Sequence, residues 1–256
     1  MVMINERQQM ILDLLDSKEF VKVNEISDAL KVSAVTIRKD LSFLEGKDLL
    51  YRTHGGARKQ SNFAFERNIS EKEEVQVEQK IAIAKRATAF IEENDFIILA
   101  SGTTMHYLAR NLRDFSKITV LTSSMKVALE LCNNDSIDII QLGGGVRKSS
   151  GSVVGPFSET ILKQFSCNKL FLGVDGIATD FGLSTSNAME AHLNNLMIES
   201  VDKVYILADS TKINKRGFGK ICDIQKADAL ITDPGITDTD FKILSDIGIE
   251  VIITDN

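Results

Sequence analysis

Apolar residues in the first 60 positions recur at helical spacing and predict three short helices, over residues 5–16, 24–30 and 33–45. In the third helix Ile37, Leu41 and Leu44 stand at positions i, i+4 and i+7 and form one buried stripe. A strand near residues 49–53 and a glycine-containing turn near residues 54–57 follow. Three small helices followed by a strand–turn hairpin predict a winged helix-turn-helix at residues 1–58.

From residue 95 onward the pattern changes to short, almost wholly apolar runs, most of them separated by helical stretches. The runs span residues 96–100, 118–121, 137–142, 169–174, 204–208, 229–232 and 251–254. Apolar strands that alternate with helices are typical of a mostly parallel sheet covered on both faces. The sequence therefore predicts an α/β protein, in which a polar linker over residues 59–77 joins the winged helix to a mostly parallel α/β domain over residues 78–256.

Composition excludes several classes of protein. The chain has 256 residues, of which 43% are apolar and 26% charged, so it is not a disordered or low-complexity chain. No apolar run approaches the roughly 18 residues of a membrane-spanning helix, and the first residues do not resemble a secretory signal. Cys132, Cys167 and Cys222 are far apart and form no metal-binding or disulfide motif. We therefore expect a cytoplasmic protein with no membrane partner, no metal and no cofactor.

Charge is distributed unevenly along the chain. The net charge is −6, yet residues 31–59 hold 7 Lys and Arg against 3 Asp and Glu. Residues 1–30 and 60–256 are both net acidic. A short basic island in an acidic protein is the part of the sequence that attracts a polyanion.

The third predicted helix has the outward face that a major-groove reader needs. With the stripe at Ile37 buried, a rotation of 100° per residue points small, polar and basic side chains outward. Arginine can grip guanine with two hydrogen bonds, valine can touch a thymine methyl group, and hydroxyls serve base edges or phosphates. The candidates for base contacts are Ser33, Val35, Thr36, Arg38 and Lys39. The candidates for phosphate or minor-groove contacts, near the hairpin, are Arg52, His54, Arg58 and Lys59.

A winged helix that mediates only protein contacts is the alternative, since polar faces with a few lysines are common on surface helices. The hairpin and the reversal of charge favour DNA.

The same residues resemble a known family. The run from Ser33 to Glu45 reads S-A-V-T-I-R-K-D-L-S-F-L-E, and R-T-H-G-G-A follows at residues 52–57. Both runs are similar to the signature of the DeoR family of bacterial transcription repressors. The resemblance implies a head that binds a double-stranded DNA operator at about residues 3–58.

Polar motifs recur at the predicted strand ends of the larger domain. Ser101 to Thr104 combine hydroxyls, a glycine and free backbone N–H groups at the start of a helix, which suits an anion. Other motifs offer glycines that allow close approach of the backbone, cations that supply positive charge, or carboxylates that accept hydrogen bonds from sugar hydroxyls. The candidate ligand residues are Ser101, Gly102, Thr103, Thr104, Gly144, Arg147, Lys148, Asp175, Asn187, Glu190, Asp209 and Lys212.

Each motif alone is more often a helix cap or a turn than a binding site. Carboxyl ends of parallel strands meet at one edge of a sheet, so their recurrence predicts one pocket for a small phosphorylated polyol. The resemblance to the DeoR family continues through these motifs. It implies a sensor domain that is related to ribose-5-phosphate isomerases and CoA transferases and binds a phosphosugar.

Two positions depart from that family pattern. Ala100 stands where the family usually has Asp, and Asn194 stands where it often has Lys. Asn at the second position resembles the N-acetylgalactosamine-type repressors, which implies an amino-sugar or related hexose phosphate as effector.

Two functional hypotheses remain. The first is a homodimeric or homotetrameric repressor of a sugar-utilisation operon, which a sugar phosphate releases from its operator. The second is an isomerase or acyl-CoA transferase that uses the carboxylates at the strand ends. His106 and His192 have no matching nucleophile or metal-ligand spacing, and we interpret both as surface or packed side chains. We expect a regulator that is not an enzyme.

Overall fold

The computed structural model describes residues 4–18, 20–45, 47, 49–53, 55–59, 63–64 and 72–255, with residues 59, 63 and 64 described by their backbone alone. It divides into two compact units, Met1–Asn62 and Phe63–Asn256. No helix among the described residues is both long and apolar enough to cross a membrane.

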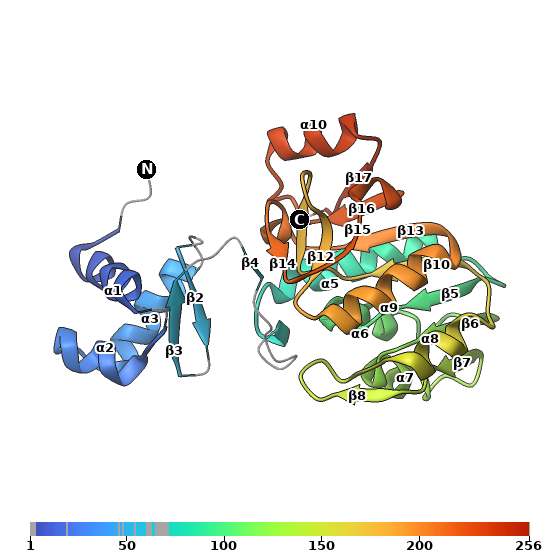
Figure 1. Ribbon diagram of the computed structural model, residues 1–256, viewed down its shortest axis with the longest axis horizontal. Helices are drawn as coiled ribbons and strands as arrows, with labels where there is room; N and C mark the ends of the chain where they lie inside the picture. Colours follow the sequence, from blue (N-terminus) through green and yellow to red (C-terminus); the bar gives the residue numbers. More distant parts are fainter. Residues whose placement is uncertain are drawn as a thin grey trace. The chain divides into compact units, whose positions relative to one another are not determined.

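The first unit is the predicted winged helix-turn-helix, drawn in blue in Figure 1. Its elements are α1 (Glu6–Ser17), β1 (Phe20–Lys22), α2 (Val23–Leu30), α3 (Ala34–Glu45), β2 (Leu50–Thr53) and β3 (Gly56–Lys59). The three strands form an antiparallel sheet in the order β1-β3-β2, in which β1 is a short strand that the sequence pattern did not predict.

Burial in this unit follows the predicted stripe. Ile37, Leu41 and Leu44 of α3 are completely buried, together with Ile11 of α1 and Ile26 of α2. About 2–5 kcal/mol is the usual cost of truncating such a side chain to alanine, so the stripe fixes how α3 is rotated.

A polar contact also locks α3 to α1. The guanidinium of Arg7 donates to both oxygens of Asp40, at 2.6 and 3.1 Å, and Gln8 donates to the same carboxylate at 3.2 Å. Asp40 is 5% exposed, so these donors offset the cost of burying its charge.

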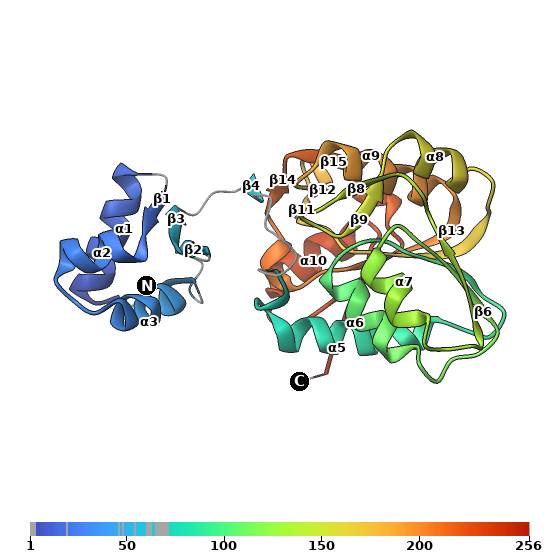
Figure 2. The same cartoon turned by 90° about the horizontal axis from the view of Figure 1, so that it is seen from below.

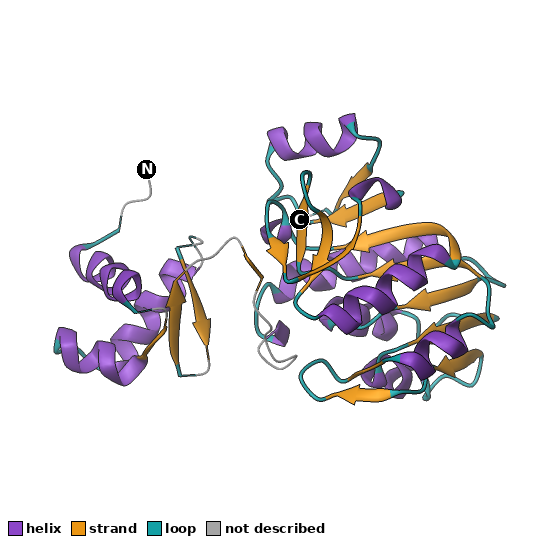
Figure 3. Ribbon diagram, viewed as in Figure 1, coloured by secondary structure: helices purple, strands orange, loops and turns teal. Residues whose placement is uncertain are grey.

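The second unit contains a seven-stranded sheet in the order β17-β16-β13-β10-β5-β6-β7, and every neighbouring pair is parallel. Each strand coincides with one of the seven predicted apolar runs, which confirms the α/β fold class. The strands are β5 (Phe96–Leu99), β6 (Ile118–Thr122), β7 (Ile137–Gln141), β10 (Cys167–Leu172), β13 (Val201–Leu207), β16 (Ala229–Thr232) and β17 (Glu250–Ile253). Figure 3 shows these strands in orange between purple helices.

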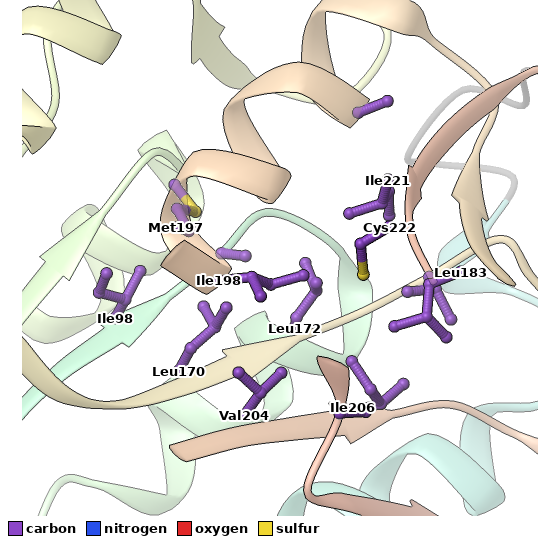
Figure 4. Close-up of a cluster of buried hydrophobic side chains, with 14 of the residues drawn as sticks. Ile98, Leu170, Leu172, Leu183, Met197, Ile198, Val204, Ile206, Ile221 and Cys222 are labelled. Carbon is purple, nitrogen blue, oxygen red and sulfur yellow. The ribbon is translucent and has the colours of Figure 1, made fainter. Parts of the chain in front are cut away.

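Helices cover both faces of this sheet (Figure 2). One face packs against α5 (Val77–Ala87), α6 (Thr103–Asn111) and α7 (Met125–Leu131). The other packs against α8 (Pro156–Leu162), α9 (Ala188–Glu199) and α10 (Asp238–Asp246). On this second face, side chains of β10 and β13 point towards Met197 and Ile198 of α9 (Figure 4). Burial on both faces explains why the strands are apolar throughout.

Smaller elements complete the second unit. The strands β8 (Gly145–Arg147) and β9 (Ser152–Val154) form a hairpin, and β11 (Gly176–Ala178), β12 (Gly182–Thr185) and β15 (Gly219–Cys222) form a small sheet. Within the predicted linker, β4 (Phe63–Ala64) pairs with β14 (Arg216–Gly217), and residues 72–73 are helical. Single 3-10 turns are η1 (Thr88–Phe90), η2 (Ser210–Lys212) and η3 (Ile224–Lys226).

Candidate functional site

The outward face of α3 carries the side chains that the helical rotation predicts. Val35 is 61% exposed, and Arg38 and Lys39 are also exposed. The Oγ of Ser33 accepts a hydrogen bond from the backbone N–H of Thr36 at 3.2 Å and so caps the first turn. The helix therefore presents two cations and one β-branched side chain to solvent while its opposite side is buried.

Arg52 lies on β2 with its guanidinium held against the end of α3. Its Nη1 donates to Ser42 Oγ at 2.6 Å and lies 3.8 Å from Glu45 Oε2. The backbone N–H of Arg52 donates to the other Glu45 oxygen at 3.1 Å. These contacts fix the hairpin to the helix and place a third cation beside the face of α3.

The remaining cations of the hairpin are described in part. Arg58 on β3 is exposed, and its guanidinium carbon lies 5.6 Å from the centre of the Phe20 ring. His54 and the side chain of Lys59 lie outside the described residues.

A second polar site lies at the carboxyl ends of β5, β10 and β13, which are neighbours in the sheet. The strand order turns between β5 and β10, because β6 and β7 continue on one side and β13, β16 and β17 on the other. Open parallel sheets bind their ligands at this switch point. The cavity here has a volume of about 80 Å³. Eight predicted residues line it: Ser101, Gly102, Thr103, Thr104, Asp175, Glu190, Asp209 and Lys212.

The first turn of α6 forms one wall of this pocket. Gly102 is its N-cap residue and has a φ of +129°, a conformation that favours glycine. No side chain caps the helix, so the N–H groups of its first turn remain available to a ligand. Thr103 and Thr104 add two hydroxyl groups there. Such an arrangement suits an anion such as a phosphate.

Asp175 follows β10 and is the most heavily bonded carboxylate of the pocket. One oxygen accepts from Lys72 Nζ at 2.6 Å, and the other accepts from Thr185 Oγ1 at 3.2 Å and from the backbone N–H of Ser186 at 3.0 Å. Burial by itself would raise the pKa of this carboxyl. The ammonium groups of Lys72 and Lys212, together with the hydrogen bonds from Lys72 and Ser186, lower the pKa by more than burial raises it. The net pKa lies well below the usual range, so Asp175 is ionised at neutral pH.

Glu190 enters the pocket from the first turn of α9. Its Oε2 lies 2.5 Å from Arg147 Nη1, and its Oε1 accepts from Ser152 Oγ at 2.7 Å. The side chains of Glu190 and Arg147 are 10% and 11% exposed. The pair thereby ties the β8–β9 hairpin to the pocket wall.

Polar groups also enter from the end of β13 and from α9. Asp209 is 3% exposed and accepts a hydrogen bond from Thr211. Lys212 lies close enough to lower the pKa of Asp175, and no ion pair of the described chain uses its ammonium. Asn194 is 5% exposed and lines the cavity, with no hydrogen bond from its amide to the residues that the structure describes. The amide is thus available to a ligand.

Four of the predicted ligand residues do not line the cavity: Gly144, Arg147, Lys148 and Asn187. The first three belong to the segment that follows β7, at the edge of the sheet, and the β8–β9 hairpin reaches the cavity through its turn residues Ser149 and Ser150 instead. Arg147 contacts Glu190, Ser149 and Ser150, Lys148 is exposed, and Gly144 packs against the backbone of Val154. Asn187 caps α9 through its side chain.

Sequence reasoning missed other residues that line the cavity. Lys72 lies in the predicted polar linker, yet its ammonium holds Asp175. Lys80 lies within α5 and is only 5% exposed, and the helical spacing of the sequence does not indicate that it is buried at the cavity. Thr185 lies beside Asp175, and hydroxyls at Ser149 and Ser150 come from the β8–β9 turn. None of these residues is adjacent in sequence to a strand end of the main sheet.

His106 and His192 lie outside this pocket. His106 Nε2 lies 3.2 Å from Glu130, and burial and Arg110 lower its pKa. His192 is exposed, 3.5 Å from Glu159. Within the described part of the chain, no group of His, Cys, Asp or Glu side chains is placed to hold a metal ion.

The chain is similar to known proteins over most of its length. The chain is 38% identical to the uncharacterised HTH-type transcriptional regulator YulB of Bacillus subtilis, over 98% of this chain and 96% of that one. It is 33% identical to the HTH-type transcriptional regulator GolR of Listeria innocua, over 98% of both chains. It is also 33% identical to a lactose phosphotransferase system repressor of Staphylococcus epidermidis, over 89% of this chain and 91% of that one.

Among solved structures, ribose 5-phosphate isomerase A from Neisseria gonorrhoeae matches with a TM-score of 0.41 at 18% identity, over 54% of each chain. Two family profiles match the chain in order. Residues 7–63 match the DeoR-like helix-turn-helix domain, and residues 75–234 match the DeoR C-terminal sensor domain. The chain belongs to the DeoR family.

Proposed function

We propose that this protein is a cytoplasmic, DNA-binding repressor of a sugar-utilisation operon, and that a phosphorylated sugar bound at the switch point of the sheet releases it from the operator. The observation that carries the proposal is the pairing of two sites in one chain: an exposed cationic recognition face on α3, and a pocket with an uncapped helix N-terminus among lysines and carboxylates.

The face of α3 supports DNA binding by its chemistry. Arg38 and Lys39 are exposed, and no ion pair of the described chain uses either of them. Their charge is therefore available to phosphates or to guanine, and Val35 can touch a thymine methyl group. A homodimer or homotetramer would place two such helices on half-sites about 10 bp apart, or a multiple of that distance.

The pocket supports a phosphorylated polyol. The N–H groups of α6 suit the phosphate, and the buried carboxylates of Asp175, Glu190 and Asp209 suit hydroxyl groups. The Asn194 amide offers one further donor and acceptor for a substituent on the sugar ring. One relative is named a lactose phosphotransferase system repressor, which agrees with a sugar-derived effector.

The alternative of an isomerase has less support from the same geometry. Asp175 is held ionised by its partners with a pKa well below its usual range, which makes it a weak general base at neutral pH. Ala100, at the position where the family usually has a carboxylate, is buried in the core. We expect no turnover of pentose or hexose phosphates.

The test is a fluorescence anisotropy titration of the full chain with duplex DNA from upstream of the neighbouring genes. Affinity is expected to fall steeply between about 50 and 200 mM salt, as it does when phosphates are neutralised. Ribose 5-phosphate, glucose 6-phosphate, galactosamine 6-phosphate and inorganic phosphate are then added separately. At least one sugar phosphate is expected to weaken binding by about 5–150-fold, the usual range of allosteric coupling. Salt-independent binding, or no response to any sugar phosphate, would contradict the proposal.

A further inference from the structure

An ion pair ties the pocket to the stretch of chain that enters α5. Lys72 Nζ lies 2.6 Å from Asp175 Oδ1, and the two side chains are 28% and 11% exposed. The first compact unit ends at Asn62, so every residue of the helix-turn-helix precedes Lys72 along the chain. We call residues 72–76 the approach segment.

Two lysines of the second unit also hold the approach segment. Lys80 Nζ donates to the backbone oxygen of Lys72 at 2.5 Å and also to that of Val75. Lys126 pairs with Glu73. Among these contacts, the Lys72 side chain is the one that links the segment directly to Asp175.

A second connection reaches the same wall of the pocket. Phe63 of β4 pairs with Arg216 of β14, directly after the first unit ends. The next residue of β14, Gly217, donates its N–H to Ser184 Oγ at 2.7 Å. The backbone oxygen of Ser184 accepts from the N–H of Asp175 at 2.9 Å. Two points near the start of the second unit, β4 and Lys72, are therefore both attached to the wall that carries Asp175.

Lys72 also stands in the way of a ligand. Its ammonium occupies one Asp175 oxygen, for which a sugar hydroxyl would compete, and a phosphate would attract that ammonium away from the carboxylate. The cavity that remains is about 80 Å³, against roughly 300–1,000 Å³ for pockets that enclose drug-sized molecules. Withdrawal of the Lys72 side chain both frees Asp175 and enlarges the space.

We propose that Lys72 is an internal competitor of the effector: a bound sugar phosphate breaks the Lys72–Asp175 pair, and the released approach segment transmits binding to the DNA-binding unit. The inference rests on the proposed function. A ligand shifts an equilibrium only through a difference in its affinity for the two states, and exclusion from the paired state supplies that difference. The pair thus favours the state that binds the operator.

The experiment compares the full-length wild type with Lys72→Met, Lys72→Arg and Lys163→Met, using the upstream duplex DNA without any sugar phosphate. Lys163 is an exposed lysine after α8 and is the matched control for loss of one positive charge. Lys72→Met is expected to bind DNA at least fivefold more weakly, and its amides at residues 72–80 are expected to exchange with deuterium at least fivefold faster. Lys72→Arg and Lys163→Met are expected to behave like the wild type. Thermal melting of each variant checks that both units remain folded.

The outcomes separate this inference from the proposed function. If Lys72→Met binds DNA as tightly as Lys163→Met, the competitor role is overturned, whether or not a sugar phosphate binds. If ribose 5-phosphate, glucose 6-phosphate and galactosamine 6-phosphate all fail to weaken DNA binding by the wild type, the proposed effector function is overturned, even if Lys72→Met weakens DNA binding. A smaller response of Lys72→Met to an effective sugar phosphate than that of the wild type would support both.

Discussion

The face of α3 and the pocket at the switch point are both charged, but their charges are arranged in opposite ways. On α3, Arg38 and Lys39 are exposed and take part in no ion pair of the described chain. At the pocket, Lys72 holds Asp175 and Arg147 holds Glu190; the Lys72 side chain is 28% exposed and the other three are 10–11% exposed. Open charge attracts any polyanion at long range and weakens with salt. Paired, buried charge responds only to a ligand that can replace a partner, which makes it selective.

The largest expected effect is on stability, and it tests whether breaking a buried ion pair costs more free energy of unfolding than breaking a more open one. Glu190→Gln leaves the Arg147 cation buried without its carboxylate, and is expected to lower the free energy of unfolding of the second unit by about 3–5 kcal/mol. Glu45→Gln, at the more open pair with Arg52, whose side chains are 21% and 40% exposed, is expected to cost only about 0–1 kcal/mol in the first unit. Urea unfolding followed by circular dichroism measures both, with the two units treated as separate transitions. Equal losses would break the distinction.

The face of α3 and the pocket also differ in how far the sequence predicts them. The outward face of α3 depends on one helix and one buried stripe, Ile37, Leu41 and Leu44, so local periodicity was sufficient. The seven strands of the parallel sheet could also be predicted from the sequence, because a strand buried on both faces is apolar along its whole length.

The pocket depends instead on contacts between residues that are far apart in sequence. Lys72 meets Asp175 across 103 positions, and no local pattern signals such a contact. Local patterns also do not encode how the β8–β9 hairpin folds, and its turn brings Ser149 and Ser150 to the cavity while Arg147 and Lys148 do not line it.

A smaller effect is expected from acid. The pKa of Asp175 is lowered in the folded protein, so its stabilising contribution is present above the unfolded value of about 3.9 and is lost as pH falls towards the folded value. Asp175→Asn is expected to cost about 1.5–3 kcal/mol at pH 7, the usual value of hydrogen bonds to a charged group. The difference from the wild type should shrink as the pH is lowered below about 4. A difference that stays constant down to pH 2 would show that Asp175 does not contribute through its charge.

The smallest effect concerns the cysteines, and it probes the packing of the second unit without changing it. Burial raises the pKa of both Cys167 and Cys222 to about 11, while Cys132 is exposed. Because the thiolate is the reactive form, iodoacetamide at pH 8 is expected to modify Cys132 first and the other two only on unfolding. Mass spectrometry of the intact chain and its peptides measures this order. Rapid modification of Cys167 or Cys222 in the native protein would contradict the packed sheet.

The most direct test of the account is the affinity of Arg38→Ala for operator DNA and for a scrambled duplex of the same length, measured beside the wild type by anisotropy. If the face of α3 reads bases, the substitution costs about 1–3 kcal/mol on the operator and less on the scrambled duplex, so that the ratio of the two affinities falls. Equal binding by Arg38→Ala and the wild type on both duplexes would show that this face does not recognise the operator.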